Sequence, residues 1–244
     1  MELENKVALV TGSAHRVGKE LAHAVAEQGC RVVIHYNRSA EKAHTTLQSL
    51  RNMNVEAIAL QADLTNLKEI DDLFKRIDKA LGPIDILVNS AAILQPIDLL
   101  DVNESDWDGT INLNMKAAFF CLQQAAVRMK SSSGGVIINI SDIIGHKPHA
   151  RFPIHSVSKA GLEMITKIAA IALAPEIRVN AIAPGPILRP EGLSIERWDN
   201  YSKKALLNMR DGANQLSDAL LFLLKNDYIT GEILVIDGGM SLVE

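Results

Sequence analysis

Seven short apolar runs recur along the chain and dominate its pattern of hydrophobic and polar positions. Each is rich in β-branched residues, and together they occupy residues 6–11, 31–36, 56–61, 84–89, 135–141, 177–182 and 232–237. Most are separated by amphipathic stretches long enough for a helix. In the clearest of these, residues 66–81, four apolar side chains fall on one stripe at helical spacing: Ile70, Leu73, Phe74 and Ile77. The pattern predicts strands that alternate with helices.

This alternation predicts an α/β fold in which right-handed crossovers produce a parallel sheet covered by helices on both faces. The strand-like runs are almost continuously apolar, as expected for strands buried on both sides. No repeat or low-complexity linker divides the chain. We therefore expect one domain over residues 1–244, a Rossmann-type, doubly wound, seven-stranded parallel sheet. Ligands bind such sheets at the carboxyl ends of the strands, so the residues that follow each strand are the candidates for function.

Composition narrows the function classes. The hydrophobic share of 48% and the charged share of 22% are those of an ordinary globular protein. A net charge of −4 argues against a nucleic-acid surface, which would be basic. Two cysteines, Cys30 and Cys121, favour a reducing cytoplasm over a disulfide scaffold. Residues 1–10 do not resemble a secretory signal, and no apolar run is long enough to span a membrane. We expect a cytoplasmic protein with a small-molecule substrate and no metal site.

The first strand is followed by the sequence TGSAHRVG, a candidate nucleotide-binding turn. Gly12 permits a tight turn and Gly18 permits close packing of the next helix, whose first backbone amides would face a pyrophosphate. The spacing differs from the usual three-glycine pattern, because Arg16 stands near the place of a middle glycine. A simple strand-to-helix turn is the alternative interpretation.

The end of the second strand favours NADPH over NADH. An NAD site usually has an acid there for the ribose hydroxyls, whereas the stretch HYNRSA has none before Glu41. Arg38 and Ser39 offer donors, and Arg16 is available from the first turn. Two guanidiniums that converge on one spot would suit a 2′-phosphate. A solvated side chain is the alternative for either arginine.

Two further strand ends add candidates for the cofactor. Asp63 follows the third strand, where its carboxylate would accept the adenine amino group; capping of the next helix is the alternative. Asn89 and small residues follow the fourth strand, where the cofactor must pass close to the backbone.

The chemistry is expected after the fifth strand. Asp142 follows it directly, His155 comes 13 residues later, and Lys159 lies four residues further on, one helical turn away and on the same face. Pro153 suits the first turn of that helix. Asn114 falls within the helix that follows the fourth strand, where a polar side chain either bonds locally or faces a cleft.

With these motifs in order from Lys6 to the C-terminus, the chain resembles the short-chain dehydrogenases/reductases. The lysine in SVSKAG and the later stretches RVNAIAPG and TGEILVIDGG carry the resemblance further. Within that superfamily it is most similar to the pteridine reductases, which share Arg16, the HY-x-RS stretch and an aspartate at position 142. His155 stands where the family has its catalytic tyrosine. The resemblance implies NADPH-dependent reduction of a dihydropterin or dihydrofolate ring.

The resemblance also implies a role for each site residue. Lys159 would bind the nicotinamide ribose, Asn114 would hold a water, Asp142 would relay a proton to a ring nitrogen, and His155 would act as the proton donor. The implied cofactor-binding set is Gly12, Ser13, His15, Arg16, Val17, Gly18, Tyr36, Asn37, Arg38, Ser39, Asp63, Leu64, Asn89, Ser90, Ala91, Lys159, Pro184, Gly185 and Ile187. The implied substrate set is Leu94, Asp142, His155 and Arg189.

Several alternatives stay open at this point. Leu94 falls where protozoan pteridine reductases have a phenylalanine, so a reductase of another carbonyl or imine is the second hypothesis. A catalytically weak NADPH-binding sensor is the third. Asp142 with water is the alternative proton source to His155, because Tyr36, Tyr201 and Tyr228 are all distant in sequence. Residues 187–212 are expected to form a lid over the substrate, and the resemblance implies a homotetramer.

Overall fold

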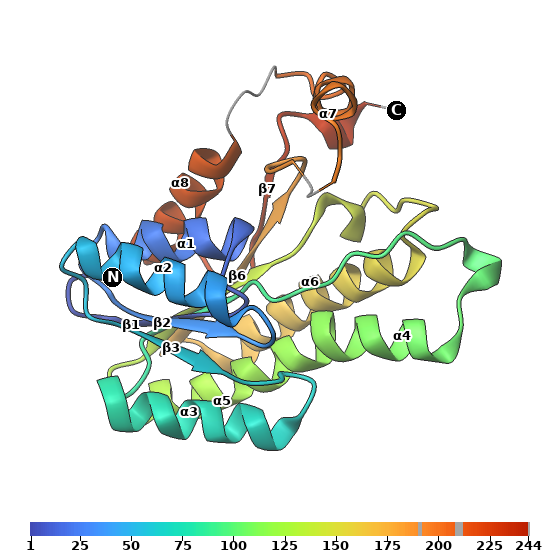
Figure 1. Ribbon diagram of the computed structural model, residues 1–244. Helices are drawn as coiled ribbons and strands as arrows, with labels where there is room; N and C mark the ends of the chain where they lie inside the picture. The colour runs from blue at the N-terminus through green and yellow to red at the C-terminus, as the bar shows by residue number, and fades with distance from the viewer. Residues whose placement is uncertain (190–191, 208–211, 244) are drawn as a thin grey trace.

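An open sheet of seven parallel strands forms the centre of the protein (Figure 1). The computed structural model describes residues 1–189, 192–207 and 212–243. Its strand order is β3-β2-β1-β4-β5-β6-β7, which confirms the predicted doubly wound fold. The strands are β1 (Val7–Val10), β2 (Arg31–Tyr36), β3 (Ala57–Gln61), β4 (Ile86–Asn89), β5 (Gly135–Ile140), β6 (Ile177–Pro184) and β7 (Ile233–Ile236).

Helices cover both faces of this sheet, and each face has its own apolar layer. One layer packs under α1 (Arg16–Ala26), α2 (Ala40–Asn52) and α8 (Gly212–Lys225). The other packs under α3 (Leu67–Leu81), α5 (Ala118–Lys130) and α6 (Pro153–Leu173). Side chains such as Phe74 are fully buried there, and each contributes roughly 1.5–3 kcal/mol by leaving water. The two layers hold the carboxyl ends of the strands in fixed relative positions.

The helical segment that carries Asn114 is not a regular α-helix throughout. The structure has α4 (Glu104–Ile111), a π-helical stretch, η2 (Asn112–Ala117), and then α5. Wider π-helical turns often occur at functional sites, because they shift backbone and side chains out of the regular ladder. Here the irregular turn contains Asn114.

The remaining short elements lie in the loops around the carboxyl ends of the strands. They are η1 (Leu99–Asp101), η3 (Ile143–Gly145), α7 (Ile195–Ser202) and η4 (Met240–Leu242). Figure 1 shows α7 beyond the end of β7, close to the C-terminal segment. Within the described ranges, no helix has the length and apolar character needed to cross a membrane.

Candidate active site

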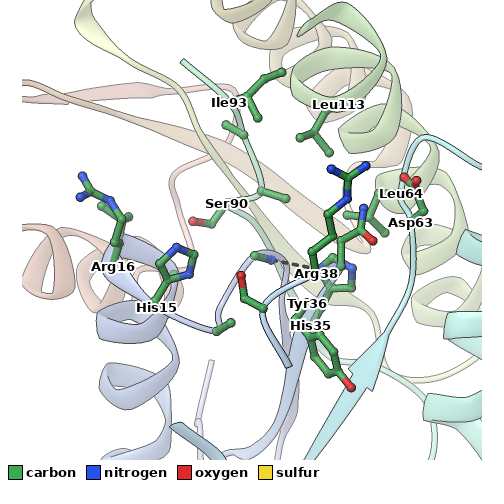
Figure 2. Close-up of a pocket in the computed structure, with 18 of the residues that line it drawn as sticks. His15, Arg16, His35, Tyr36, Arg38, Asp63, Leu64, Ser90, Ile93 and Leu113 are labelled. Atoms are coloured by element: carbon green, nitrogen blue, oxygen red, sulfur yellow. Dashed lines mark hydrogen bonds between the residues drawn. The ribbon is translucent and has the colours of Figure 1, made fainter. Parts of the chain in front are cut away.

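A groove of about 710 Å³ lies at the carboxyl ends of β1 to β4, where the strand order reverses (Figure 2). Open α/β sheets bind ligands at such a switch point. The groove brings together most of the predicted cofactor-binding residues from separate elements. Those that line it are Gly12, His15, Arg16, Val17, Gly18, Tyr36, Asn37, Arg38, Ser39, Asp63, Leu64, Ser90 and Ala91.

The two glycines of the first turn are required by close backbone contacts. Gly12 has a φ of +66°, and a Cβ there would lie 2.8 Å from the Cα of Ala91. A Cβ on Gly18 would lie 2.4 Å from the carbonyl oxygen of Gly12. Thr11 Oγ1 accepts the backbone N–H groups of Ser90 and Ala91, at 2.9 and 3.1 Å, which ties the β4 loop to the same turn. The result is a closely packed cradle of backbone groups with no room for a side chain at Gly12 or Gly18.

His35 holds this cradle in place, and sequence reasoning gave it no site role. It is buried at the end of β2. Its Nδ1 accepts the Gly12 backbone N–H at 3.0 Å, so its Nε2 carries the proton and donates to the Ala62 carbonyl, also at 3.0 Å. Burial lowers the pKa of His35 to about 4, which keeps the ring neutral at pH 7. The signal in the sequence was a histidine inside an otherwise apolar strand.

Arg16 and Arg38 do not converge as predicted. Arg16 has a left-handed backbone conformation, with a φ of 54°, and its Nη1 donates to the Arg189 carbonyl at 3.2 Å. Figure 2 shows Arg16 on one side of the groove and Arg38 on the other side, near Asp63. Arg16 is held by the segment that follows β6, and the two-arginine site stays a prediction. Arg38 stays at the end of β2.

Asp63 lines the groove, and it does not cap the following helix. Its Oδ1 accepts hydrogen bonds from the backbone N–H and hydroxyl of Thr65, at 3.0 and 2.7 Å. These bonds lower the pKa of Asp63, with smaller contributions from Asn37 and Arg38. The cap of α3 is Asn66, whose side chain accepts the N–H of Lys68. The carboxylate of Asp63 is thus fixed at the groove wall.

Two predicted cofactor residues turn their side chains into the interior instead. Asn89 Nδ2 donates to Asn139 Oδ1 at 2.9 Å and to the Ala118 carbonyl at 3.2 Å, which links β4 to β5 and α5. Ser13 is fully buried, and its hydroxyl donates to the Val10 carbonyl at 2.6 Å. These two side chains have structural partners, and their predicted contact with the cofactor stays a prediction.

At the other end of the site, Asn114 and His155 form a buried network with the loop after β4. Asn114 Oδ1 accepts the backbone N–H of Ile93, and its Nδ2 donates to the Ile93 carbonyl, both at 2.9 Å. The same Nδ2 donates to Ser158 Oγ at 3.2 Å, while His155 Nδ1 lies 2.9 Å from the Ile93 carbonyl. The Asn114 amide therefore orients the His155 imidazole. That Asn114 also holds a water stays a prediction.

These contacts assign the proton positions on His155. His155 Nδ1 lies 2.9 Å from the Ile93 carbonyl and 3.1 Å from Asn114 Nδ2. Because a carbonyl oxygen can only accept, we assign the tautomer in which Nδ1 carries the proton and donates it to Ile93. The Nε2 is buried without a hydrogen-bond partner among the described atoms, and it lies 3.6 Å from Asp142 Oδ2. The Nε2 edge of the imidazole therefore faces the carboxylate of Asp142.

Lys159 lies one turn further along α6 and completes the constellation. It is 4% exposed, and its Nζ donates to the Ile140 carbonyl at 2.7 Å. Burial lowers the pKa of Lys159 to about 8, although the carboxylates of Asp142 and Glu163 act in the opposite direction. The structure thus brings Asn114, Asp142, His155 and Lys159 to one place, as the spacing indicated.

Tyr201 lies closer to this site than its distance in sequence suggested. Partial burial and the carboxylate of Asp142 raise the pKa of Tyr201. Shortly after α7, Ala205 packs with Ile143 and Met240, so this segment lies against the residue that follows Asp142. Tyr201 is distant from Asp142 in sequence but near it in the fold. The predicted lid, 187–212, lies partly outside the described residues, since 190–191 and 208–211 are not described.

The predicted substrate residues Leu94 and Arg189 do not line the groove. Leu94 is 50% exposed, and Arg189 Nη1 donates to the Leu193 carbonyl at 2.6 Å. Pro184, Gly185 and Ile187 do not line the groove either, and their cofactor contacts stay predictions together with that of Lys159. Groove residues that sequence reasoning missed are Ala14, His35, Thr65, Ala92, Ile93, Gln95, Gly109 and Leu113.

The sheet order, the glycine turn and the buried His155 and Lys159 are typical of a nucleotide-binding α/β oxidoreductase. Residues 6–198 match the family model described as short chain dehydrogenase, and the chain belongs to that family.

Relatives in this family have different substrates. The chain is 33% identical over 243 residues to the 3-oxoacyl-(acyl-carrier-protein) reductase FabG of Staphylococcus epidermidis, which covers 98% of this chain and 100% of that protein. It is 36% identical to subunit BbsD of the (2S)-((R)-hydroxy(phenyl)methyl)succinyl-CoA dehydrogenase of Thauera aromatica, with 99% of each chain covered. Among solved structures, FolM alternative dihydrofolate reductase 1 from Brucella canis, complexed with NADP, matches with a TM-score of 0.94 and 30% identity. That match covers 100% of this chain and 96% of the other.

Proposed function

We propose that this protein is an NADPH-dependent reductase of a dihydropterin or dihydrofolate-type ring. The observation that carries the proposal is the Asp142–His155 pair, in which a carboxylate and an imidazole lie 3.6 Å apart at the end of β5. Reduction of a ring C=N bond needs a proton at nitrogen as well as a hydride at carbon. A pair that holds one exchangeable proton beside a nucleotide groove supplies that need.

When bound, NADPH supplies the hydride, and the side chains of this chain handle the proton. The carbon of the C=N bond gains the hydride, the nitrogen gains the proton shared by Asp142 and His155, and the pair regains a proton from solvent. Asn114 keeps His155 Nδ1 on the Ile93 carbonyl, so that Nε2 is the nitrogen that exchanges. The Lys159 ammonium lies one turn away and stabilises negative charge in the site.

The preference for NADPH rests on the end of β2. Arg38 lies there and no acid precedes Glu41. Ser39 occupies the N-cap position of α2, and its hydroxyl makes no capping bond, so it is available to a ligand. A helix N-terminus with an arginine beside it favours a phosphate over a hydroxyl. Arg16 would join this site only by leaving the Arg189 carbonyl.

The fit of the groove to a dinucleotide rests on the cradle itself. A Cβ at Gly12 or Gly18 would collide with the protein's own backbone, so only glycine lets the turn fold closely enough to present its amides to a ligand. Gly12, Arg38 and Asp63 would hold the adenosine half. Lys159 and the loop after β6 would hold the nicotinamide half.

Reduction of another carbonyl is the second candidate function. Two observations favour it: the relatives FabG and BbsD act on substrates without a pterin ring, and the side chain at position 94 is a half-exposed leucine. An aliphatic side chain offers less stacking to a flat aromatic ring than an aromatic one does.

We also propose that the protein acts as a cytoplasmic homotetramer of one-domain chains. Exposed apolar side chains on α5 and α6 support an interface there. They are Phe119, Val127, Val157, Met164, Ile168 and Ile171. Light scattering of the purified protein measures the assembly directly, and a monomer at micromolar concentration would overturn this part.

The function is tested by following NADPH oxidation with a panel of acceptors: dihydropterin, dihydrofolate, a 3-oxoacyl thioester and simple ketones. We expect turnover with the two ring substrates. Activity with the thioester or ketones alone would support the second candidate. If no acceptor is reduced although NADP⁺ binds in calorimetry, the protein is a nucleotide-binding sensor.

Asp142→Asn sharpens the assay, because it keeps the size of the side chain and removes its proton. We expect it to lower turnover of dihydropterin by about a hundredfold, the usual range for a lost general acid. The matched control is Asp101→Asn in η1, an exposed aspartate, which should leave the rate unchanged. A ring reduction that tolerates Asp142→Asn would contradict the proposed proton path.

A further inference from the structure

A cluster of three polar side chains lies on the far side of Lys159, outside the nucleotide groove. Ser141 and His146 come from the loop after β5, and Glu163 comes from α6, one turn after Lys159. Ser141 Oγ donates to Glu163 Oε1 at 2.8 Å. His146 Nδ1 lies 3.4 Å from the same oxygen.

The cluster runs from the interior to the surface. Ser141 is 3% exposed, while the side chains of Glu163 and His146 are 13% and 36% exposed. Gly145 lets the loop lie directly on α6: a Cβ there would be 2.9 Å from Glu163 Oε1 and 3.2 Å from the carbonyl carbon of Lys159. The loop that carries Asp142 is therefore in close contact with the turn that carries Lys159 and Glu163.

The charges around Lys159 come from both elements packed against it. Asp142 on the loop and Glu163 on α6 both raise its pKa against the effect of burial. Asp142 is also the neighbour of His155, and it belongs to the proposed proton path. Glu163 faces His146 instead, and His146 in turn lies near Asp237. Glu163 is thus a carboxylate near Lys159 that takes no part in the proposed proton path.

We propose that Glu163 is a positioning residue that links the two halves of the catalytic site. Its carboxylate balances the buried ammonium of Lys159, and through Ser141 it fixes the loop from which Asp142 faces His155. His146 connects this carboxylate to solvent. The inference rests on the proposed function only where it treats Asp142 and Lys159 as the groups that act in catalysis.

A double-mutant cycle tests the link to Lys159 without any substrate. Glu163→Gln removes the charge and keeps the hydrogen bond to Ser141. We expect it to raise the unfolding equilibrium constant at pH 7 by about tenfold, because the buried ammonium loses its counter-charge. In the Lys159→Met background the same change should be neutral or stabilising. Urea titrations of the four proteins measure the cycle.

The pH dependence of turnover tests the same link in the active enzyme, and it serves alone if Lys159→Met does not fold. Loss of the Lys159 proton is expected to produce a fall in rate near pH 8. Glu163→Gln removes an attraction, so this fall should move to lower pH by about one unit. Ser141→Ala keeps the charge, and should lower the turnover number with little movement of the pH limb. Glu176→Gln, an exposed glutamate before β6, is the matched control for loss of charge.

Each outcome separates the two proposals. Glu163→Gln could change the unfolding equilibrium constant equally with and without Lys159, and leave the pH limb unmoved. That result would overturn the role of Glu163 and leave the proposed reaction intact. A clear coupling in the cycle in a protein that reduces none of the ring acceptors would support Glu163 and contradict the proposed substrate. A pH limb that moves upward would also overturn the inference.

Discussion

The nucleotide groove and the catalytic end of the sheet are built in opposite ways. The groove is formed largely by backbone: Gly12 and Gly18 allow backbone segments to pack closely, and a hydrogen bond to the His35 ring fixes the turn. The catalytic end is formed by buried polar side chains, of which His155 and Lys159 are 5% and 4% exposed. In the groove, charged side chains such as Arg38 lie at the wall and can move to meet a ligand.

This difference determines how well the groove and the catalytic end tolerate substitutions. A backbone cradle depends on a few residues without side chains, and its charged wall can be altered with moderate effects on affinity. A buried network has no water to replace a lost partner, and most of its polar atoms are bonded to another member. Removing one member of the network therefore costs more than removing one charge at the groove.

The largest effect is expected from His155→Phe, which keeps a flat ring and removes both nitrogens. Turnover on a confirmed substrate should fall by about a hundredfold or more, as for loss of a general acid. Steady-state kinetics over pH 5–9 provide the measurement, with the exposed His44→Phe as matched control. A rate within a few fold of wild type would make His155 a spectator and Asp142 with water the proton source.

The next largest effect is expected at His35, which supports the groove, and it is measured as a change in the free energy of unfolding. His35 has a folded-state pKa of about 4, below the 6.5 of an unfolded chain. Its contribution is therefore complete above pH 6.5 and is lost as pH falls towards 4, by about 3 kcal/mol. Urea unfolding between pH 7.5 and 4.5 should show this loss. In His35→Gln, which cannot take up a proton, the slope over this range should be flatter; an unchanged slope would assign the acid sensitivity to other groups.

A smaller effect is expected at the groove wall. Arg38→Asp should weaken NADPH binding by about tenfold or more and improve NADH, because one charge-assisted phosphate contact is lost and a ribose acceptor is gained. Arg16→Ala should change the NADPH affinity less, since the Arg16 guanidinium bonds to the Arg189 carbonyl. Calorimetric titration of both variants with NADPH and with NADH measures these affinities. An equal loss for the two variants would show that the arginines do converge when the ligand is bound.

The architecture could be predicted from the sequence because it depends on short-range pattern. All seven strands fall within the predicted runs or differ at the ends by a few residues, and α3 starts one residue after the predicted boundary at Asn66. Apolar runs report burial directly, and the alternation with amphipathic stretches reports parallel topology. The grouping of Asp142, His155 and Lys159 followed from helical spacing and from the strand end.

Other parts of the site depend on contacts between distant segments, which pattern does not report. Arg16 is drawn to Arg189, and Asn89 turns inward to Asn139, because a partner far away in sequence is available. Tyr201 approaches Asp142 only through the packing of Ala205 on Ile143. The sequence pattern alone does not predict that these segments lie side by side.

The smallest effect is expected from Tyr201→Phe, and it bears directly on which end of the network donates the proton. The phenol is 39% exposed, so water can take the place of its hydroxyl at a cost below about 1 kcal/mol, and turnover should fall by no more than about fivefold. Burial and Asp142 raise its pKa, so the phenol stays protonated at neutral pH and is available as a donor. Tyr228→Phe, at a fully exposed position, is the matched control. If Tyr201→Phe instead costs a hundredfold while His155→Phe costs little, the phenol on α7 is the proton donor, and the buried imidazole serves to hold Asp142 in place.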